Sequence, residues 1–121
     1  MSGTLRDLKC WQKALNLSVS IYRISKSFPR DEMFGLTSLR RASVSAVSNI
    51  AEGKGRSSEK ELVRFLANAR GSLFEMEAQI TLAERLSDLS QADATKLLLM
   101  AAETGKMING LMRTTLPKTQ A

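Results

Sequence analysis

The sequence predicts an all-α protein, an antiparallel up-down-up-down four-helix bundle, and three features lead to this fold class. Only two prolines and seven glycines interrupt the 121 residues, so long segments are available for helices. Apolar residues recur at steps of three and four in four successive segments, the period of an amphipathic helix. Short connections between these segments place consecutive helices antiparallel. The chain is long enough for one domain, residues 1–121, around one hydrophobic core.

A first helix is predicted from Asp7 to about Ser27, because the following Phe28-Pro29 disfavours the helical conformation. Its first apolar row consists of Leu8, Trp11, Leu15, Ser18 and Tyr22. A second row beside it consists of Cys10, Ala14, Leu17, Ile21, Ile24 and Phe28. Together the rows cover about half of the helix surface, more than one pair of neighbours needs. We therefore expect this helix to be deeply buried or to face another subunit.

A second helix is predicted from Gly35 to a corner at Gly53 and Gly55, since glycine accepts the left-handed conformation of a C-terminal cap. Its inner row consists of Leu36, Leu39, Ser43, Ala46 and Ile50. A polar stripe on the same helix consists of Ser38, Arg41, Ser45, Ser48, Asn49, Glu52 and Arg56. The next helix is expected to start at Ser58, because Ser58 and Glu61 have the spacing of a capping box.

A third helix is predicted from Glu59 to Leu86, and a fourth from a Ser90 cap to about Thr115. The third helix has a coiled-coil-like seam of alternating steps, formed by Leu62, Leu66, Ala69, Leu73, Met76, Ile80 and Ala83. The inner row of the fourth helix consists of Leu98, Ala101, Gly105, Ile108 and Met112. Further apolar residues lie on its other sides, namely Leu97, Leu99, Met100, Met107 and Leu111. This surplus again favours contact with other subunits.

The net charge of +6 is unevenly placed, with 11 Lys/Arg against 5 Asp/Glu in residues 1–60 and seven of each in residues 61–121. Such asymmetry favours an anionic partner, and a solvated basic surface is the alternative. The main candidates for contacts with nucleic-acid phosphates are Arg40, Lys54, Arg56, Lys60 and Arg64. Secondary candidates are Arg41 and, on the first helix, Lys9, Lys13, Arg23 and Lys26. Because the aromatic residues occupy core-like positions, we expect electrostatic binding and no reading of unpaired bases.

The sequence predicts no catalytic residue, no metal site and no cofactor. It contains no histidine, the commonest general base and metal ligand, and its one cysteine, Cys10, lies in an apolar row. A polar set on the second and third helices, Arg41, Asn49, Glu52 and Arg70, is instead predicted to form a structural network that fixes helix register. A non-enzymatic protein is therefore expected.

The predicted location is the cytoplasm, without a membrane partner. Residues 1–7 hold no apolar signal core, and no apolar run reaches the length of a membrane span. With a single cysteine the chain has no internal disulfide, which argues against an exported disulfide scaffold.

The chain also carries a family resemblance, and its most specific piece is Asn49-Ile50-Ala51-Glu52-Gly53. Later matching residues are Arg41, Ser45, Ser48, Gly55-Arg56, Phe65-Leu66 and Ala69-Arg70-Gly71-Ser72-Leu73. Earlier ones are Asp7-Leu8-Lys9, Trp11-Gln12-Lys13-Ala14, Tyr22, Phe28-Pro29 and Gly35-Leu36-Thr37-Ser38. With them the chain resembles the 23S ribosomal RNA intervening-sequence protein family, also called four-helix-bundle proteins, over roughly residues 7–89. Relatives often have proline at Val47 and glutamine at Leu39, so the second helix is expected to be straighter here.

The resemblance implies a homo-oligomer, and pentameric rings are the family's known assembly. Relatives in diversity-generating retroelements are accessory proteins that bind RNA and a reverse transcriptase, although the family has no established biochemical activity. We therefore expect an oligomeric binding or scaffold protein whose partners are copies of itself, RNA or another protein. The alternative is a purely structural protein–protein interaction module with no nucleic-acid role. Salt-dependent RNA binding separates the two.

Overall fold

The computed structural model describes residues 3–120, and most of them are helical. The four long helices are α1 (Lys9–Ile24), α2 (Met33–Lys54), α3 (Glu59–Arg85) and α4 (Gln91–Gln120). Three short 3-10 turns flank α1 and precede α2, namely η1 (Leu5–Asp7), η2 (Ser25–Ser27) and η3 (Arg30–Glu32). No strand occurs among the described residues, so the predicted all-α class is confirmed for them.

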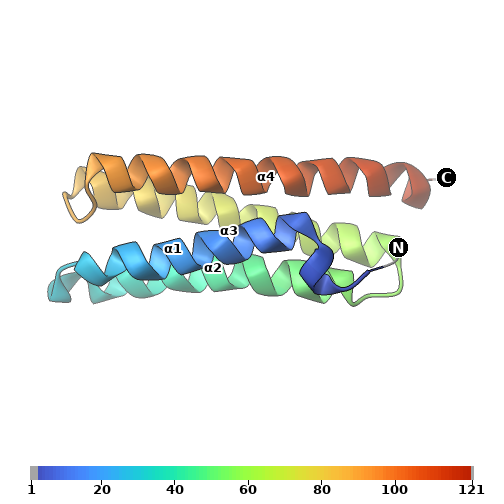
Figure 1. Cartoon of the computed structure of the whole chain (residues 1–121), viewed down its shortest axis with the longest axis horizontal. Helices are drawn as coiled ribbons and strands as arrows, with labels where there is room; N and C mark the ends of the chain where they lie inside the picture. The colour runs from blue at the N-terminus through green and yellow to red at the C-terminus, as the bar shows by residue number, and fades with distance from the viewer. Residues whose placement is uncertain (1–2, 121) are drawn as a thin grey trace.

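The four helices lie side by side along one long axis (Figure 1). The α1–α2 and α3–α4 connections lie at one end of the molecule. The α2–α3 connection lies at the other end, together with the first and last described residues. α1 packs against α2 and α4, and α3 packs against the same two helices. Each helix therefore borders two others around a shared core, which is the arrangement of a four-helix bundle.

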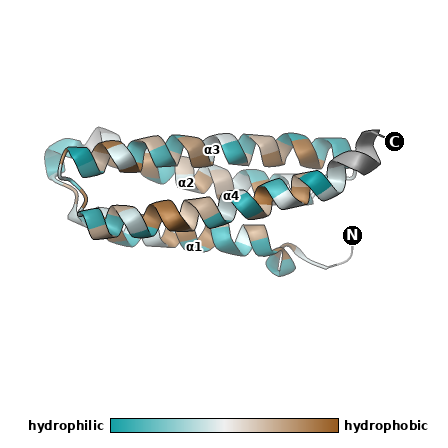
Figure 2. Cartoon of the chain, turned by 90° about the horizontal axis from the view of Figure 1, so that it is seen from above, coloured by the Kyte–Doolittle hydropathy of each residue, from teal (hydrophilic) through white to brown (hydrophobic). Residues whose placement is uncertain are grey.

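The seam predicted for α3 is the central strip of the core. Six of its seven residues are buried, namely Leu66, Ala69, Leu73, Met76, Ile80 and Ala83. The seventh, Leu62, is half-buried and packs against them. Hydrophobic and hydrophilic residues alternate along the helices, as expected where one side of each is covered (Figure 2). The alternation of four- and three-residue steps thus identified the buried side of α3 correctly.

The first helix is shorter than predicted, because Leu8 adopts an extended backbone (φ −79°, ψ 112°) that separates η1 from α1. Asp7 does not cap α1. Its carboxylate accepts a 3.0 Å hydrogen bond from the Thr4 backbone N–H and closes η1. The second apolar row supplies the buried residues Cys10, Ala14, Leu17 and Ile21. In the first row, Leu15 and Tyr22 are 38% and 40% exposed, so this helix has an apolar side that the bundle leaves uncovered.

The inner row of α2 lies in the core as predicted. Leu39, Ala46 and Ile50 are buried, and Ser43 is buried beside Ser18 of α1, with 2.9 Å between the two hydroxyl oxygens. The Ser43 hydroxyl also donates a 2.8 Å hydrogen bond to the Arg40 carbonyl oxygen, so both buried hydroxyls have a partner. The Ser18–Ser43 bond links α1 to α2 near the middle of the bundle.

Gly53 and Gly55 do not act as the predicted left-handed cap. Gly55 has φ −79° and ψ −8°, and no positive φ occurs at Gly53. Gly53 is instead buried within the last turn of α2, where a Cβ would lie 3.0 Å from the Phe65 Cβ and 3.1 Å from a methyl carbon of Leu62. Glycine is therefore required at position 53 by the close approach of α3 to α2.

The inner row of α4 differs from the prediction at two positions. Leu97 and Thr104 are buried, whereas the predicted Leu98 and Gly105 are only half-buried. Thr104 tolerates burial because its hydroxyl donates a 2.9 Å hydrogen bond to the Met100 carbonyl oxygen. Ala101, Ile108 and Met112 are buried as predicted. The helix also continues to Gln120, past the end predicted near Thr115.

Candidate nucleic-acid interface

The corner between α2 and α3 gathers four of the five main candidates for phosphate contacts. Lys54 ends α2, Arg56 lies in the connection, and Lys60 and Arg64 lie in the first turns of α3. Ser58 caps α3 as predicted, because its hydroxyl oxygen accepts a 3.0 Å hydrogen bond from the Glu61 N–H. Lys60 is exposed and Lys54 is half-buried. The short, capped connection therefore holds these cations near one another.

Arg56 and Arg64 are already engaged with neighbouring side chains. Arg56 forms a 3.0 Å ion pair with Glu52, and Arg64 binds Glu61 through two hydrogen bonds of 2.8 and 3.2 Å. Both guanidinium groups also lie over the Phe65 ring, 4.9 and 4.5 Å from its centroid. All four paired side chains are more than a third exposed, so solvent screens both pairs and they add little to stability. An incoming phosphate can therefore replace either carboxylate at little cost.

Three carboxylates offset the positive charge of the corner. The hydrogen bond from Arg64 holds the pKa of the Glu61 carboxyl below its usual value, and the same contact raises the pKa of Arg64. Both groups are thus charged at neutral pH. Glu52 and Glu59 add two further negative charges, so the four cations of the corner have a surplus of only one. The corner alone is a weak attractor of anions.

The surplus of positive charge is larger over the whole end of the bundle than at the corner alone. Because the chain starts and finishes at this end, Arg6, Lys9 and Arg113 lie there as well (Figure 1). We call this set of seven side chains the cationic end: Arg6, Lys9, Lys54, Arg56, Lys60, Arg64 and Arg113. Four described carboxylates accompany them, Asp7, Glu52, Glu59 and Glu61, which leaves a surplus of three. Arg6 and Arg113 were not among the predicted contacts, and the signal that could have found them is the even number of antiparallel helices, which brings the first and last segments to the same end.

Arg40 does not belong to this interface, which corrects the prediction. It lies about 21 Å along α2 from Lys54. Its Nε donates a 2.9 Å hydrogen bond to the Ser25 hydroxyl, and its Nη2 donates a 3.1 Å bond to the Tyr22 carbonyl oxygen. The guanidinium also lies over the Tyr22 ring, 4.7 Å from its centroid. Arg40 therefore fastens α2 to the end of α1.

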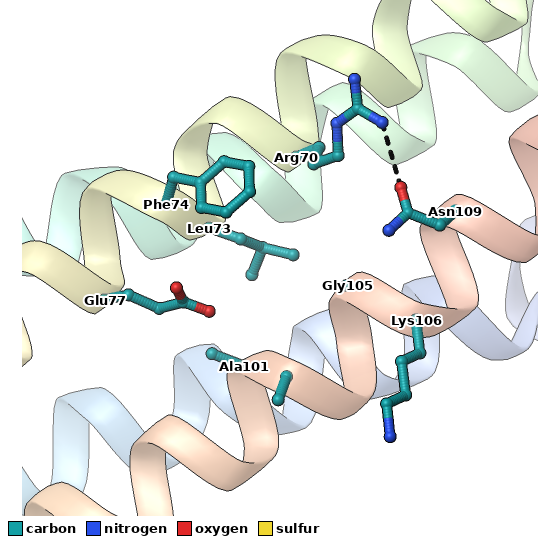
Figure 3. Close-up of a pocket in the computed structure, with 9 residues that line it drawn as sticks. Arg70, Leu73, Phe74, Glu77, Ala101, Gly105, Lys106 and Asn109 are labelled. Atoms are coloured by element: carbon teal, nitrogen blue, oxygen red, sulfur yellow. Dashed lines mark hydrogen bonds between the residues drawn. The ribbon is translucent and has the colours of Figure 1, made fainter.

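The structural network predicted for Arg41, Asn49, Glu52 and Arg70 is not formed. Glu52 pairs with Arg56 at an exposed position and contacts neither Arg41 nor Arg70 through an ion pair. Arg41 is exposed. Arg70 faces α4 (Figure 3), and its Nη1 donates a 3.0 Å hydrogen bond to the side-chain oxygen of Asn109. The rotation of α3 places Arg70 on the side of that helix away from α2.

Neutral hydrogen bonds occupy the place where the ionic network was predicted. The Asn49 amide donates to the Ser45 carbonyl and hydroxyl oxygens at 2.9 and 3.1 Å, and the Ser72 hydroxyl of α3 donates to the Ser45 hydroxyl at 3.0 Å. With the Ser18–Ser43 bond, they tie α2 to both neighbours. Hydroxyl groups cost less to desolvate than charges do. Small polar side chains thus help to fix the register of α2.

The comparison with known families matches the model of the 23S rRNA-intervening sequence protein to residues 6–110. The chain belongs to this family. The match confirms the resemblance and extends it from residue 89 into the last turns of α4. The family's name refers to 23S rRNA and states no activity. No match is found among curated proteins.

A solved structure supports the same fold for this family member. It is the crystal structure of a protein of unknown function from the S23 ribosomal protein family of Bacteroides thetaiotaomicron. The two chains are 19% identical and superpose with a TM-score of 0.81, over 85% of this chain and 97% of the other. At this identity the similarity establishes the shared fold.

The residues with chemical reactivity in this family member are few. Cys10 is 3% exposed, and burial raises the pKa of its thiol to about 11, so the thiol is protonated at neutral pH. Among the side chains that the structure describes, no group of three or more Cys, Asp or Glu residues is placed to hold a metal ion. Within residues 3–120, no helix is long and apolar enough to cross a membrane.

Proposed function

We propose that this protein is a non-enzymatic, homo-oligomeric binding protein of the cytoplasm that binds structured RNA through the cationic end. The observation that carries the proposal is the meeting of seven cations and only four carboxylates at one end of the bundle. Cationic side chains bind phosphates without any catalytic group or cofactor. The family's link by name to 23S rRNA favours RNA over other polyanions.

The surroundings of the cations favour binding to the phosphate backbone of folded RNA. Phe65 is an aromatic ring beside the corner cations, and it is half-buried beneath the guanidinium groups of Arg56 and Arg64. It is therefore not free to stack on an unpaired base, which is how proteins usually hold single-stranded RNA. Phosphate contacts place a protein on a duplex without reading its sequence. We accordingly expect affinity for RNA helices with little sequence preference.

We further propose an up-down-up-down bundle that assembles into a closed ring. The alternating ends of the helix connections support this topology (Figure 1). One apolar surface supports the assembly: Leu15, Val19, Tyr22 and Val44 are 38–44% exposed on the adjoining helices α1 and α2, and we call it the α1–α2 face. The predicted surplus on α4 is mostly covered, since Met100, Met107 and Leu111 pack against the core. The proposed number of five subunits rests on the family resemblance.

Light scattering at micromolar concentration should give a mass several times that of the 13.3 kDa chain. Val19→Glu combined with Val44→Glu should lower the mass to that of one chain, because the pair places two charges in the α1–α2 face. The helical circular-dichroism signal should be unchanged. Leu86→Glu is the matched control, because Leu86 is 54% exposed directly after α3 and lies outside the α1–α2 face. A wild-type mass of one chain, or an unaltered mass in the double variant, contradicts this interface.

An RNA hairpin should bind with strong salt dependence. One phosphate contact for each cation of the cationic end predicts a loss of affinity on the order of 10³–10⁴-fold between about 50 mM and about 200 mM salt. Lys54→Gln, Arg56→Gln and Lys60→Gln together should reduce that ratio to roughly a hundredfold, since about four contacts remain. The measurement is a mobility-shift titration of wild-type and triple variant at both salt concentrations.

A second triple variant controls for net charge. Arg23→Gln, Lys26→Gln and Arg30→Gln remove the same three charges from exposed positions at the opposite end of the bundle. This protein should retain the wild-type salt dependence. Equal losses in the two triple variants would show that total charge, and not the cationic end, determines affinity. Absence of binding near physiological salt would favour the alternative of a protein-interaction module without a nucleic-acid role.

A further inference from the structure

A groove between α3 and α4 lies in the middle of the bundle, away from the cationic end. It has a volume of about 180 Å³, and Leu73, Ala101 and Gly105 contribute its apolar surface. The groove exists because the small residues Ala101, Ala102 and Gly105 of α4 lie opposite the larger side chains of α3 (Figure 3). A Cβ built at Gly105 would still lie 3.8 Å from the nearest methyl carbon of Leu73, which is ordinary van der Waals contact. The space is therefore open to a side chain from outside.

Phe74 and Arg70 stand at the α3 edge of this groove (Figure 3). Phe74 is 63% exposed, the largest exposed fraction among the big hydrophobic side chains described. Arg70 is half-buried, and among the described residues it forms no ion pair with a carboxylate. Its hydrogen bond to the Asn109 side-chain oxygen, at 3.0 Å, uses one of five N–H donors. The groove thus pairs an uncovered aromatic ring with a partly desolvated cation.

The size and the charge of the groove define what fits it. Pockets for cofactors and drug-sized ligands usually measure about 300–1,000 Å³, so this groove is too small for them and suits one large side chain. Arginine and exposed aromatic residues are typical of the few positions that dominate protein–protein binding. The other charged residues at the groove are Glu77, at the far end from Arg70, and Lys106, whose side chain points away from the groove (Figure 3). At the end of the groove near Asn109, the hydrogen-bonding capacity that remains free therefore belongs to the guanidinium of Arg70.

We propose that this groove docks a partner protein through one large apolar side chain with a carboxylate beside it. The apolar side chain lies on Leu73 and against Phe74, and the carboxylate binds the remaining donors of Arg70. Asn109 holds the guanidinium in place for this contact from the facing helix. This surface is separate from the cationic end, so the inference does not depend on RNA binding.

Two dipeptides, blocked at both termini, test the proposal on the full chain. Both begin with phenylalanine, and they differ only in whether the second residue is glutamate or glutamine. The probes are N-acetyl-phenylalanyl-glutamate amide and the matched glutamine peptide. In amide NMR spectra of the ¹⁵N-labelled protein, the glutamate peptide should shift signals of residues 70–77 and 101–109. It should bind about tenfold more tightly than the glutamine peptide, the difference expected for one hydrogen bond between charged groups. Equal affinities, or shifts outside these residues, overturn the proposal.

Two variants and a control make the test specific. Arg70→Gln should abolish the difference between the peptides, whereas Arg85→Gln, at an exposed arginine of the same helix, should preserve it. Gly105→Leu should fill the groove and weaken both peptides. Should Gly105→Leu disturb the fold, the Arg70 comparison decides alone. Movement of the same signals on raising the protein concentration, without peptide, would assign the groove to a second copy of this chain and overturn the proposal.

Discussion

Replacing Ile80 by alanine should lower the free energy of unfolding by about 2–5 kcal/mol. Ile80 is 0% exposed in the buried seam of α3 and belongs to the core cluster that all four helices share. Its loss removes buried apolar surface and leaves a cavity that close-packed neighbours fill only in part. Few single substitutions in this chain are expected to cost more.

Urea denaturation of wild-type protein and variant gives the difference in the free energy of unfolding, provided that both are measured at the same chain concentration. An oligomer gains apparent stability with concentration, so unequal samples would hide the effect. Leu82→Ala is the matched control, two residues along the same helix, because Leu82 is 59% exposed. Its expected change is within about 0.5 kcal/mol. Equal losses for the two variants would mean that α3 buries a different side from the one described.

The buried side of α3 was predictable because one of its apolar rows is unbroken, although a second packing face was suggested by apolar residues outside that row, namely Val63, Phe65, Phe74 and Leu82. A seam of alternating four- and three-residue steps can face only one way, and Leu66 and Ile80 are both fully buried. The first helix offers two apolar rows of equal quality. Spacing shows which residues share a side of a helix, but it does not show which side the neighbours cover. Only packing decided that Leu17 is buried and Leu15 exposed.

In the candidate site, too, features set by neighbouring residues were predictable, whereas features set by contacts between helices were not. Lys54, Arg56 and Lys60 are close in the chain, so one short connection was enough to bring them together. The roles of Arg40 and Arg70 depend on the rotation of each helix about its axis. Arg70 was predicted to face α2, but the rotation of α3 directs it to Asn109 of α4. Single-sequence periodicity does not fix helix rotation accurately enough to separate these two directions.

The corner glycine was located correctly, but the physical reason for it was wrong. Both a left-handed cap and a close helix approach require glycine, and the sequence contains no feature that separates the two. The backbone separates them, because no positive φ occurs at Gly53 and Gly55. At Gly53 the requirement is space: besides the Phe65 and Leu62 side chains, the Leu62 carbonyl oxygen lies 3.4 Å from a built Cβ. At this contact, near its N-terminal end, α3 begins to pack against α2.

Gly53→Ala should therefore destabilise the protein even though alanine is the better helix former. Added volume in a packed contact costs about 1–3 kcal/mol, and the gain in helix propensity returns at most about 1 kcal/mol. We expect a net loss of about 1–2 kcal/mol, because the Phe65 Cβ, 3.0 Å from the added Cβ, is fixed to the α3 backbone and cannot move aside as the end of a flexible side chain does. Thermal or urea unfolding of wild-type protein and variant, at the same chain concentration, measures this loss of stability.

Gly71→Ala provides the control with the opposite sign. Gly71 lies inside α3 with no atom within 4 Å of a built Cβ, so alanine meets open space there. Only the helix propensity changes, and the variant should gain about 0.5–1 kcal/mol. Opposite shifts in the two variants would separate packing from backbone preference within one fold. A gain in both variants would show that α2 and α3 separate at the corner without cost, and that the close approach does not explain Gly53.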